Sequence, residues 1–374
     1  MFRFIHSSDL HLGKRFGNMP EDLRGRLREA RHMALRRLAE AARAHEAGVI
    51  LLAGDTFDTE TPSPEIRRQT LAEMASHAPL QWIILPGNHD SLQATELWNA
   101  LRAEAPDNVI LATEAAPIAL SSDATLLPSP CTTRRPGRDL TEWVDQAATP
   151  ERSIRICLAH GGILHFSEDG DASGIIAPDR ARRAGLDYLA LGDWHGTMSV
   201  DPRTWYSGTP EPDQFKHNAP GRALAVTIPA AGAEPVVTPV ETGTFSWSIC
   251  DLHLLAEDDP VALLQSLLPE GVQRRQTLMK LFARGRCHPE ERAALAAAIE
   301  HAAPEFAFLE LEDEALETEC EATDLDLIDR NGALRIAADA LLAESENETL
   351  SADDRRVAKD ALLRLFAYAQ KISS

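Results

Sequence analysis

Short runs of apolar residues recur along the first part of the chain, and each of them ends at a cluster of Asp, His or Asn. The runs lie at Phe2–Ile5, Val49–Ala53, Gln81–Leu85, Ile154–Ala159 and Tyr188–Leu191. Short apolar runs that are closed by Gly, Pro or polar residues are typical of buried strands in an α/β protein. Because ligands bind at the carboxyl ends of strands in open α/β sheets, we expect the polar clusters to meet at a sheet edge. For any single cluster, the alternative is an ordinary polar turn.

The segments between these runs have helical character. An Ala-, Leu-, Arg- and Glu-rich stretch predicts one long helix from Pro20 to Gly48. Shorter helices are expected at Glu65–Ser76 and at Ser91–Glu104, where Asp90 would cap the first turn. The strands of a second sheet and a return strand are expected at Val109–Ala112, Pro117–Leu120, Ala124–Leu127 and Arg222–Ile228.

The last third of the chain is built differently. Its pattern predicts strands at Phe245–Leu255, Thr277–Ala283 and Glu305–Leu311 and helices at Pro260–Leu268 and Pro289–Ala302. Asp313–Asp329 is dense in acid and is typical of a solvated linker. Two amphipathic helices are expected after it, at Leu334–Leu342 and Val357–Ile372. We therefore divide the chain into a core domain at 1–242, a small α/β domain at 243–320, and an acidic linker with C-terminal helices at 321–374.

The clusters at the ends of the apolar runs are rich in metal-binding groups. Carboxylate, imidazole and amide donors together suit divalent metals of intermediate hardness, such as Mn, Fe or Zn, rather than a structural site made of sulfur ligands. Two such metals about 3.5–4 Å apart can clamp the attacking and leaving oxygens of a phosphoryl centre. We expect a single site there, with the candidate residues Asp9, His11, Asp55, Asn88, His89, Asp90, His160, Asp193 and His195.

These clusters also resemble the motifs of a known family. Calcineurin-like metallophosphoesterases carry similar motifs, which here are Asp9-x-His11, Gly54-Asp55, Gly87-Asn88-His89-Asp90, His160 and Gly192-Asp193-Trp194-His195. Tyr206-Ser207-Gly208-Thr209-Pro210 resembles a segment of the DNA-repair nuclease branch, which includes the SbcD-type and YhaO-type exonucleases. The resemblance implies an α/β fold, with a two-sheet β-sandwich nuclease domain flanked by helices, a small α/β cap domain and C-terminal helices.

The resemblance further implies a role for each candidate residue. The ligands would be Asp9, His11 and His195 for one metal and Asn88 and His160 for the other, with Asp55 bridging the two. His89 would be the general acid that protonates the leaving oxygen, or would orient the scissile phosphate. Asp90 would fix the His89 ring by a hydrogen bond.

One position departs from the family pattern. The last motif is usually Gly-His-x-His, and this chain has Asp193 in place of the first histidine. As a ligand to the second metal, Asp193 would make that site harder and more negative, which favours Mn or Mg over Zn. Alternatively, Asp193 lies behind the ligands and the second metal is held more weakly. We expect two divalent metal ions and take Mn²⁺ as the first choice, with Mg²⁺, Fe²⁺ and Zn²⁺ as alternatives.

The charge of the chain bears on the substrate. The formal net charge is −21 and the pI is near 5.0, whereas a free-standing nucleic-acid binder is usually basic. Either the substrate is not a long nucleic acid, or DNA contacts are confined to basic patches and a partner supplies the rest. Candidate patches are a run of arginines from Arg24 to Arg37, the pair Arg67-Arg68 and the pair Arg134-Arg135. Each of these is either a solvated, internally paired surface or a phosphate contact.

Other features concern location and partners. The five cysteines form no C-x-x-C pair, which favours a reducing compartment, and we expect no signal peptide and no membrane span. A cytoplasmic, nucleoid-associated protein is the expectation. In the resembled family, C-terminal helices bind an SMC-like ATPase; here, packing on the chain's own cap is the alternative. A homodimer is left open, and the chain has no P-loop.

The combined interpretation is a two-metal phosphodiesterase acting on DNA in repair, mainly an exonuclease, with some endonuclease activity on single strands. An alternative is a phosphatase or cyclic-nucleotide phosphodiesterase for small molecules, which the acidity favours. A further alternative is a non-catalytic scaffold subunit, and the presence of His89 beside an almost complete ligand set argues against it.

Overall fold

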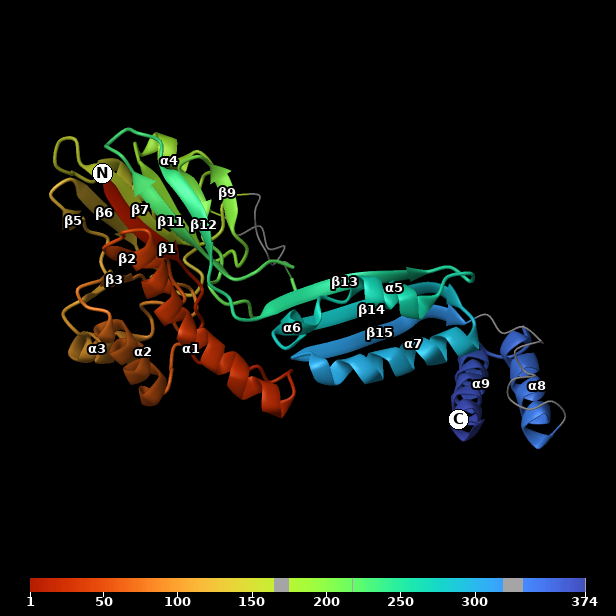
Figure 1. Ribbon diagram of the computed structural model, residues 1–374. Helices are drawn as coiled ribbons and strands as arrows, with labels where there is room; N and C mark the ends of the chain where they lie inside the picture. The colour runs from red at the N-terminus through yellow and green to blue at the C-terminus, as the bar shows by residue number, and fades with distance from the viewer. Residues whose placement is uncertain (165–174, 217, 319–331, 374) are drawn as a thin grey trace. The chain divides into compact units, whose positions relative to one another are not determined.

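Three β-sheets organise the part of the chain that the structure describes, which comprises residues 1–164, 175–216, 218–318 and 332–373 of a computed structural model (Figure 1). The chain divides into two units, Met1–Trp247 and Ser248–Ser374, and each is described by itself. Two mixed sheets belong to the first unit, and the third sheet belongs mainly to the second. The expected α/β fold class is therefore confirmed.

The first sheet has the strand order β12-β11-β1-β2-β3-β4. Strands β1 to β4 run parallel, whereas β11 pairs antiparallel with both β1 and β12. Every residue of β2 is buried, as expected for a parallel strand that is covered on both faces. The strands are β1 (Phe2–Ser7), β2 (Val49–Leu52), β3 (Gln81–Ile84), β4 (Val109–Leu111), β11 (Arg222–Ile228) and β12 (Val236–Glu241).

The second sheet has the order β5-β6-β7-β8-β10-β9. Its four central strands are parallel, and an antiparallel strand lies at each edge. Strands β9 and β10 were not predicted from the sequence, and the prediction that Val109–Ala112 belongs to this sheet is wrong, because it pairs with β3 in the first sheet as β4. The strands are β5 (Ile118–Ser121), β6 (Ala124–Ser129), β7 (Ile154–His160), β8 (Tyr188–Gly192), β9 (Met198–Asp201) and β10 (Thr204–Tyr206).

The two sheets pack face to face around one apolar core, in which Phe4 and Ile83 of the first sheet meet Ile156 and Tyr188 of the second. On the outer face of the first sheet lie α1 (Glu21–Ala44), α2 (Pro64–Ser76) and α3 (Thr95–Glu104), which bury a second core against it (Figure 1). The outer face of the second sheet carries η1 (Glu142–Gln146) and α4 (Arg180–Arg183). The result is a sandwich of two sheets flanked by helices.

The second unit contains a three-stranded sheet of order β13-β14-β15 with its own apolar core. Strand β15 continues to Thr318, so the first residues of the predicted acidic linker are strand rather than linker. Residues 319–329 of that linker lie outside the described residues. The elements are β13 (Ser246–Leu254), α5 (Pro260–Leu267), α6 (Gly271–Arg274), β14 (Thr277–Cys287), α7 (Pro289–Ala302), η2 (Ala303–Glu305), β15 (Phe308–Thr318), α8 (Ala333–Glu346) and α9 (Ala352–Ser373). The domain division at 242 and 320 stays a prediction.

Helix α3 begins at Thr95 rather than at Ser91, and Asp90 does not cap it. The Asp90 carboxylate instead accepts hydrogen bonds from the backbone N–H groups of Gly87 (2.7 Å) and Phe57 (3.0 Å). Buried backbone donors need a partner, and the carboxylate supplies one to each of these two.

Among the described residues, no helix combines the length and the apolar character needed to cross a bilayer.

Candidate metal centre

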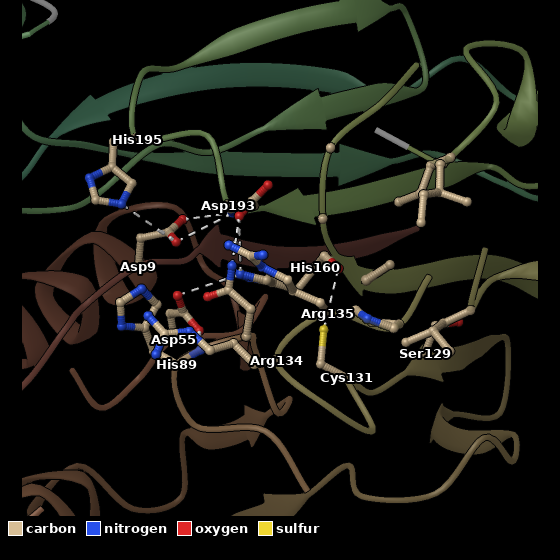
Figure 2. A pocket seen from close by; sticks show the side chains of 18 of the residues that line it. Asp9, Asp55, His89, Ser129, Cys131, Arg134, Arg135, His160, Asp193 and His195 are labelled. Carbon is tan, nitrogen blue, oxygen red and sulfur yellow. Dashed lines mark hydrogen bonds and ion pairs between the residues drawn. The ribbon is translucent and has the colours of Figure 1, made fainter. Parts of the chain in front are cut away.

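The carboxyl ends of five parallel strands deliver the candidate residues to one cavity of about 670 Å³ (Figure 2). The strands are β1, β2 and β3 of the first sheet and β7 and β8 of the second, as the apolar runs predict. Asp90 lies beneath this cavity and does not line it. The candidate residues that line the cavity are Asp9, His11, Asp55, Asn88, His89, His160, Asp193 and His195.

The loops that carry these residues are tightly constrained. Asp9, His11, Asp55 and Asp193 all have a positive φ, of 54°, 42°, 53° and 98°, in a region that non-glycine residues rarely adopt. Such strain persists only where the surroundings impose it, and it is concentrated at functional sites. Here the surroundings include backbone hydrogen bonds from Asp9 N to Gly54 O (3.1 Å) and from His11 N to Asp55 O (2.9 Å).

At two positions of the motifs, neighbouring atoms lie so close to the backbone that only glycine fits. A Cβ atom on Gly87 would lie 2.1 Å from Asp55 Oδ1, and one on Gly54 would lie 2.3 Å from the ring of His160. Any side chain at either position would therefore displace a candidate ligand. This is the physical reason for glycine beside Asp55 and Asn88 in these motifs.

Asp9, His11 and His195, which we call the first donor set, offer three ligand atoms within 4.8 Å of one another. The Nε2 atoms of the two histidines are 3.3 Å apart and lie 4.0 and 3.9 Å from Asp9 Oδ1. Behind each ring stands a further carboxylate: Asp58 Oδ1 lies 3.4 Å from Nδ1 of His11, and Asp213 Oδ1 lies 3.2 Å from Nδ1 of His195.

Asn88 and His160, the second donor set, lie beside Asp193. Nδ2 of Asn88 donates to Asp193 Oδ1 (3.1 Å), and His160 Nε2 is 3.7 Å from the same oxygen. Because His160 Nδ1 lies 2.8 Å from the carbonyl of Ala53, which can only accept, Nδ1 carries hydrogen; in the neutral ring, Nε2 therefore holds the lone pair that can bind a metal.

Two buried atoms of the second donor set are available to bind a cation. His160 Nε2 and Asn88 Oδ1 are both buried and have no hydrogen-bond partner among the described residues. Buried polar atoms without a partner are rare in folded proteins, and a binding site for an ion is one reason for them. The residues present therefore fit a metal ion at this position.

Asp55 faces both donor sets. Its Oδ2 lies 3.8 Å from Nε2 of His11 and 3.5 Å from Nε2 of His160, while Oδ1 accepts the backbone N–H of His89 (2.9 Å). Asp9, Asp55 and His160 also offer ligand atoms within 4.8 Å of one another. This geometry is compatible with a carboxylate shared by two cations.

The electrostatics of the cavity also favour cations. Burial alone would lower the pKa of His160, but the carboxylates of Asp55, Asp9 and Asp193 raise it to about 9. Burial, together with the nearby charges of Asp90 and Asp9, raises the pKa of Asp55 well above its usual range. In contrast, burial lowers the pKa of His11 to about 4. Without a metal, the site therefore retains protons where a divalent cation would otherwise balance the charge.

The position of Asp90 corrects one prediction from the sequence. The carboxylate of Asp90 makes its hydrogen bonds to backbone N–H groups, and it does not hold the ring of His89. Nδ1 of His89 instead lies 3.0 Å from the carbonyl oxygen of Asp58. Asp90 thus supports the loop that carries Asn88 and His89, whereas Asp58 orients the His89 ring.

The sequence did not point to three residues that support the first donor set, namely Asp58, Asp213 and Arg31. Arg31 is 1% exposed and donates to the carbonyls of Leu10 (2.6 Å), Asp9 (2.9 Å) and Glu211 (2.8 Å). The prediction of a solvated or phosphate-binding Arg31 is therefore wrong. The sequence did contain a signal that Arg31 is buried. Its spacing along α1 places it on the same face of the helix as the buried residues Leu27, Leu35 and Leu38.

The segment Tyr206–Pro210 packs directly against the first donor set. Thr209 N donates to the carbonyl of His195 (2.9 Å), and Thr209 Oγ1 donates to the carbonyl of Asp9 (2.9 Å). Gly208 has φ +75°, and a Cβ there would lie 2.8 Å from the oxygen of His195. Glycine at this position therefore allows the backbone of the segment to approach the site closely.

Comparisons with known proteins identify several relatives. The uncharacterized metallophosphoesterase YhaO of Bacillus subtilis is 30% identical over 227 residues, which cover 57% of this chain and 54% of YhaO. The D component of the nuclease SbcCD of Rhodobacter capsulatus is 33% identical over 131 residues, covering 34% of this chain and 31% of that protein. The protein of the same name from Escherichia coli K12 is 36% identical over 97 residues, covering 24% and 22%. The matches thus span about half, or less, of each relative.

A family model described as calcineurin-like phosphoesterase matches residues 2–197. This match covers more than half of the 374 residues and includes every candidate residue. The family assignment made from the motifs is confirmed, and with it the dependence of such hydrolases on divalent metals. The chain belongs to the calcineurin-like phosphoesterase family.

Proposed function

We propose that this chain is a two-metal phosphodiesterase that cleaves DNA, as an exonuclease with some endonuclease activity on single strands. The observation that carries the proposal is the juxtaposition of two donor sets in one cavity, with Asp55 facing both. The SbcCD proteins among its relatives are named as parts of a nuclease, which supports DNA as the substrate.

Each donor set has a role in this proposal. The first donor set would hold one cation, the second would hold the other, and Asp55 would contribute to both. When bound, divalent ions polarise phosphoryl oxygens and acidify water. Asp193 would join the second donor set as a hard ligand, so we propose Mn²⁺ as the physiological metal, ahead of Mg²⁺, Fe²⁺ and Zn²⁺.

His89 would handle the proton of the leaving oxygen. The carbonyl of Asp58 can only accept, so Nδ1 of His89 carries hydrogen and Nε2 is the atom available for exchange in the cavity. As an imidazolium, His89 can donate from Nε2 to the leaving oxygen or to a phosphoryl oxygen. Asp90 would act indirectly, by holding the backbone of the loop on which Asn88 and His89 stand.

We further propose that an SMC-like ATPase completes the DNA-binding surface, because this chain alone carries a formal charge of −21. The second unit would supply a cap and a partner-binding surface. Leu362 of α9 is already buried against Ala338 of α8, whereas Val357 and Tyr368 are exposed. The exposed residues are therefore the better candidates for partner contacts. A cytoplasmic, nucleoid-associated location would follow from this role, and a homodimer is left open.

The test is hydrolysis by the purified chain with Mn²⁺. Linear single- and double-stranded DNA would be compared with bis-p-nitrophenyl phosphate, p-nitrophenyl phosphate and cyclic nucleotides. His89→Ala serves as the control and is expected to lose about 10²- to 10⁴-fold in rate while it keeps its metal. DNA cleavage that disappears in the variant supports the nuclease. Turnover of small esters alone, with and without a partner ATPase, would favour a small-molecule phosphoesterase.

A further inference from the structure

Three arginines line the same cavity as the metal donors. They lie on the segment 132–138 that follows β6, which we call the arginine loop. Arg134, Arg135 and Arg138 all line the cavity that the two donor sets line. Figure 2 shows Arg134 and Arg135 in that cavity together with Asp55 and His160.

These arginines differ from several arginines on the helices of the first unit. On the helices, Arg67 makes two hydrogen bonds to Glu104 (2.9 and 3.0 Å), Arg36 pairs with Glu73 (3.2 Å) and Arg31 is buried. Arg134 and Arg135, by contrast, are exposed, and neither has a hydrogen-bond or ion-pair partner among the described residues; the same is true of Arg138. Three unpaired guanidinium groups on a chain of charge −21 form a local cationic surface.

The ends of the arginine loop are fixed to the rest of the site. At its start, Cys131 N donates to the carbonyl of Pro86, and Leu92 N donates to the carbonyl of Cys131 (both 3.0 Å). At its end, the buried side chain of Arg180 donates to the carbonyl of Thr141. A phosphate arriving at the loop therefore meets a segment that is anchored on both sides, which lowers the entropic cost of binding.

The metal donors and the arginine loop suit different parts of one ligand. The donors include several carboxylates, so they require cations before they can accept a phosphate. The arginine loop can bind phosphate oxygens directly, through the planar, multi-donor guanidinium group. A p-nitrophenyl ester or a cyclic nucleotide has a single phosphate, whereas a polynucleotide has a phosphate at every residue. A polynucleotide can therefore offer one phosphate to the metals and neighbouring phosphates to the arginines.

We propose that the arginine loop clamps the phosphates of a single DNA strand that neighbour the scissile one, and so selects polynucleotides over small phosphate esters. The proposal rests on the proposed function, since it assumes that the scissile phosphate sits at the two donor sets. It assigns the discrimination between substrates to Arg134, Arg135 and Arg138, and the chemistry to the two donor sets.

The test compares two triple variants of equal charge. Arg134→Gln/Arg135→Gln/Arg138→Gln removes the clamp, and Arg36→Gln/Arg68→Gln/Arg182→Gln removes three exposed arginines that lie outside the cavity. For a single-stranded oligonucleotide, the first variant should raise KM at least tenfold with kcat within about twofold of wild type. Its kinetics with bis-p-nitrophenyl phosphate and its metal content should stay unchanged.

Salt dependence gives a second measurement. Each phosphate contact in a single strand contributes about 0.7 to the slope of log affinity against log salt. Losing three contacts should therefore flatten the slope by about 2, and the control variant should retain it. Arg→Lys at all three positions should fall between wild type and the Gln variant, because lysine keeps the charge but not the paired geometry.

Binding separates this proposal from the nuclease proposal. The affinity of a fluorescein-labelled oligonucleotide would be measured by anisotropy in the His89→Ala background, with and without the arginine loop substitutions. Loop-dependent binding without DNA cleavage by wild type would support phosphate binding by the arginine loop and overturn the nuclease proposal. Cleavage with loop-independent KM and affinity would overturn the clamp alone. Loss of metal or of small-ester turnover in the loop variant, or no measurable DNA binding by any form, would also overturn the clamp.

Discussion

The first and second donor sets of the metal centre place negative charge differently. Behind the two histidines of the first donor set stand carboxylates, Asp58 and Asp213, in contact with Nδ1. Behind His160 in the second set stands the carbonyl of Ala53. A carboxylate behind a ligating histidine fixes its tautomer and makes it a better donor, whereas a carbonyl chiefly fixes the tautomer. The second set has its carboxylate, Asp193, beside the donors themselves.

The carboxylates of the two donor sets also differ in how firmly they are held in place. Asp213 is buried and is paired with Lys14 (2.6 Å) and Arg31 (3.7 Å), and its pKa stays well below the usual range despite burial because of these charges and of His195. The side chain of Asp193 is 35% exposed. We therefore expect the first donor set to hold its cation more tightly and the second to be the exchangeable position.

The largest effect is expected for Asp55→Asn, because Asp55 is the residue that faces both donor sets. The substitution removes a charge that both cations would share, so binding should weaken at both positions and hydrolysis should fall by at least about 10³-fold. Metal content after gel filtration, measured beside activity, checks this. Retention of one tightly bound ion would mean that Asp55 serves only one donor set.

Asp213→Asn should weaken the first donor set selectively. Loss of such a support costs about 10- to 100-fold in metal affinity. Asp58→Asn is the matched control, since it also removes a carboxylate behind a histidine, but one whose side chain is 23% exposed and has no arginine partner among the described residues. We expect a smaller loss there. Metal titration of both variants measures the two losses in affinity, and circular dichroism confirms folding. Equal losses in metal affinity would contradict the proposed link between the rigidity of the supporting carboxylate and affinity.

Only part of this comparison of the donor sets could be predicted from the sequence. The position of the site at the ends of five strands could be predicted, because apolar runs that are closed by polar clusters have few other interpretations in an α/β protein. The supporting residues were not, because their role depends on contacts across the fold. Asp213 contacts His195 across a separation of 18 residues, and Arg31 lies in a basic run that has the character of a solvated surface.

The arginine pairs illustrate the same limit. Arg67-Arg68 and Arg134-Arg135 look alike in the sequence, and either could be internally paired or bind phosphate. The structure separates them, because Glu104 lies beside the first pair although it is 37 residues from Arg67 along the chain. The role assigned to Asp90 was wrong for a related reason. The family resemblance implied a hydrogen bond to His89, but two buried N–H groups use both carboxylate oxygens.

A pH titration sharpens the comparison of the donor sets. His160, with a pKa of about 9, is protonated in the metal-free site at neutral pH, so a cation must displace that proton; His11, with a pKa of about 4, is already neutral. Apparent affinity at the second donor set should therefore rise about tenfold per pH unit from about pH 7 and level off above about pH 9. Calorimetry in two buffers of different ionisation enthalpy should detect about one proton released per ion near neutral pH. Release of almost no protons would contradict the protonation of His160 in the metal-free site.

The smallest effect is expected for Asp193→His, which restores the histidine of the usual family motif. If Asp193 is a ligand, the variant exchanges a hard oxygen donor for imidazole, and the second donor set should shift its preference from Mn²⁺ toward Zn²⁺ with affinities changed by less than about tenfold. The first donor set should be unaffected, because the Asp193 N–H that contacts Asp9 belongs to the backbone. Competition between Mn²⁺ and Zn²⁺, followed by metal analysis, measures the shift. An unchanged preference would place Asp193 behind the ligands, and the charge of the second donor set would then rest on Asp55 alone.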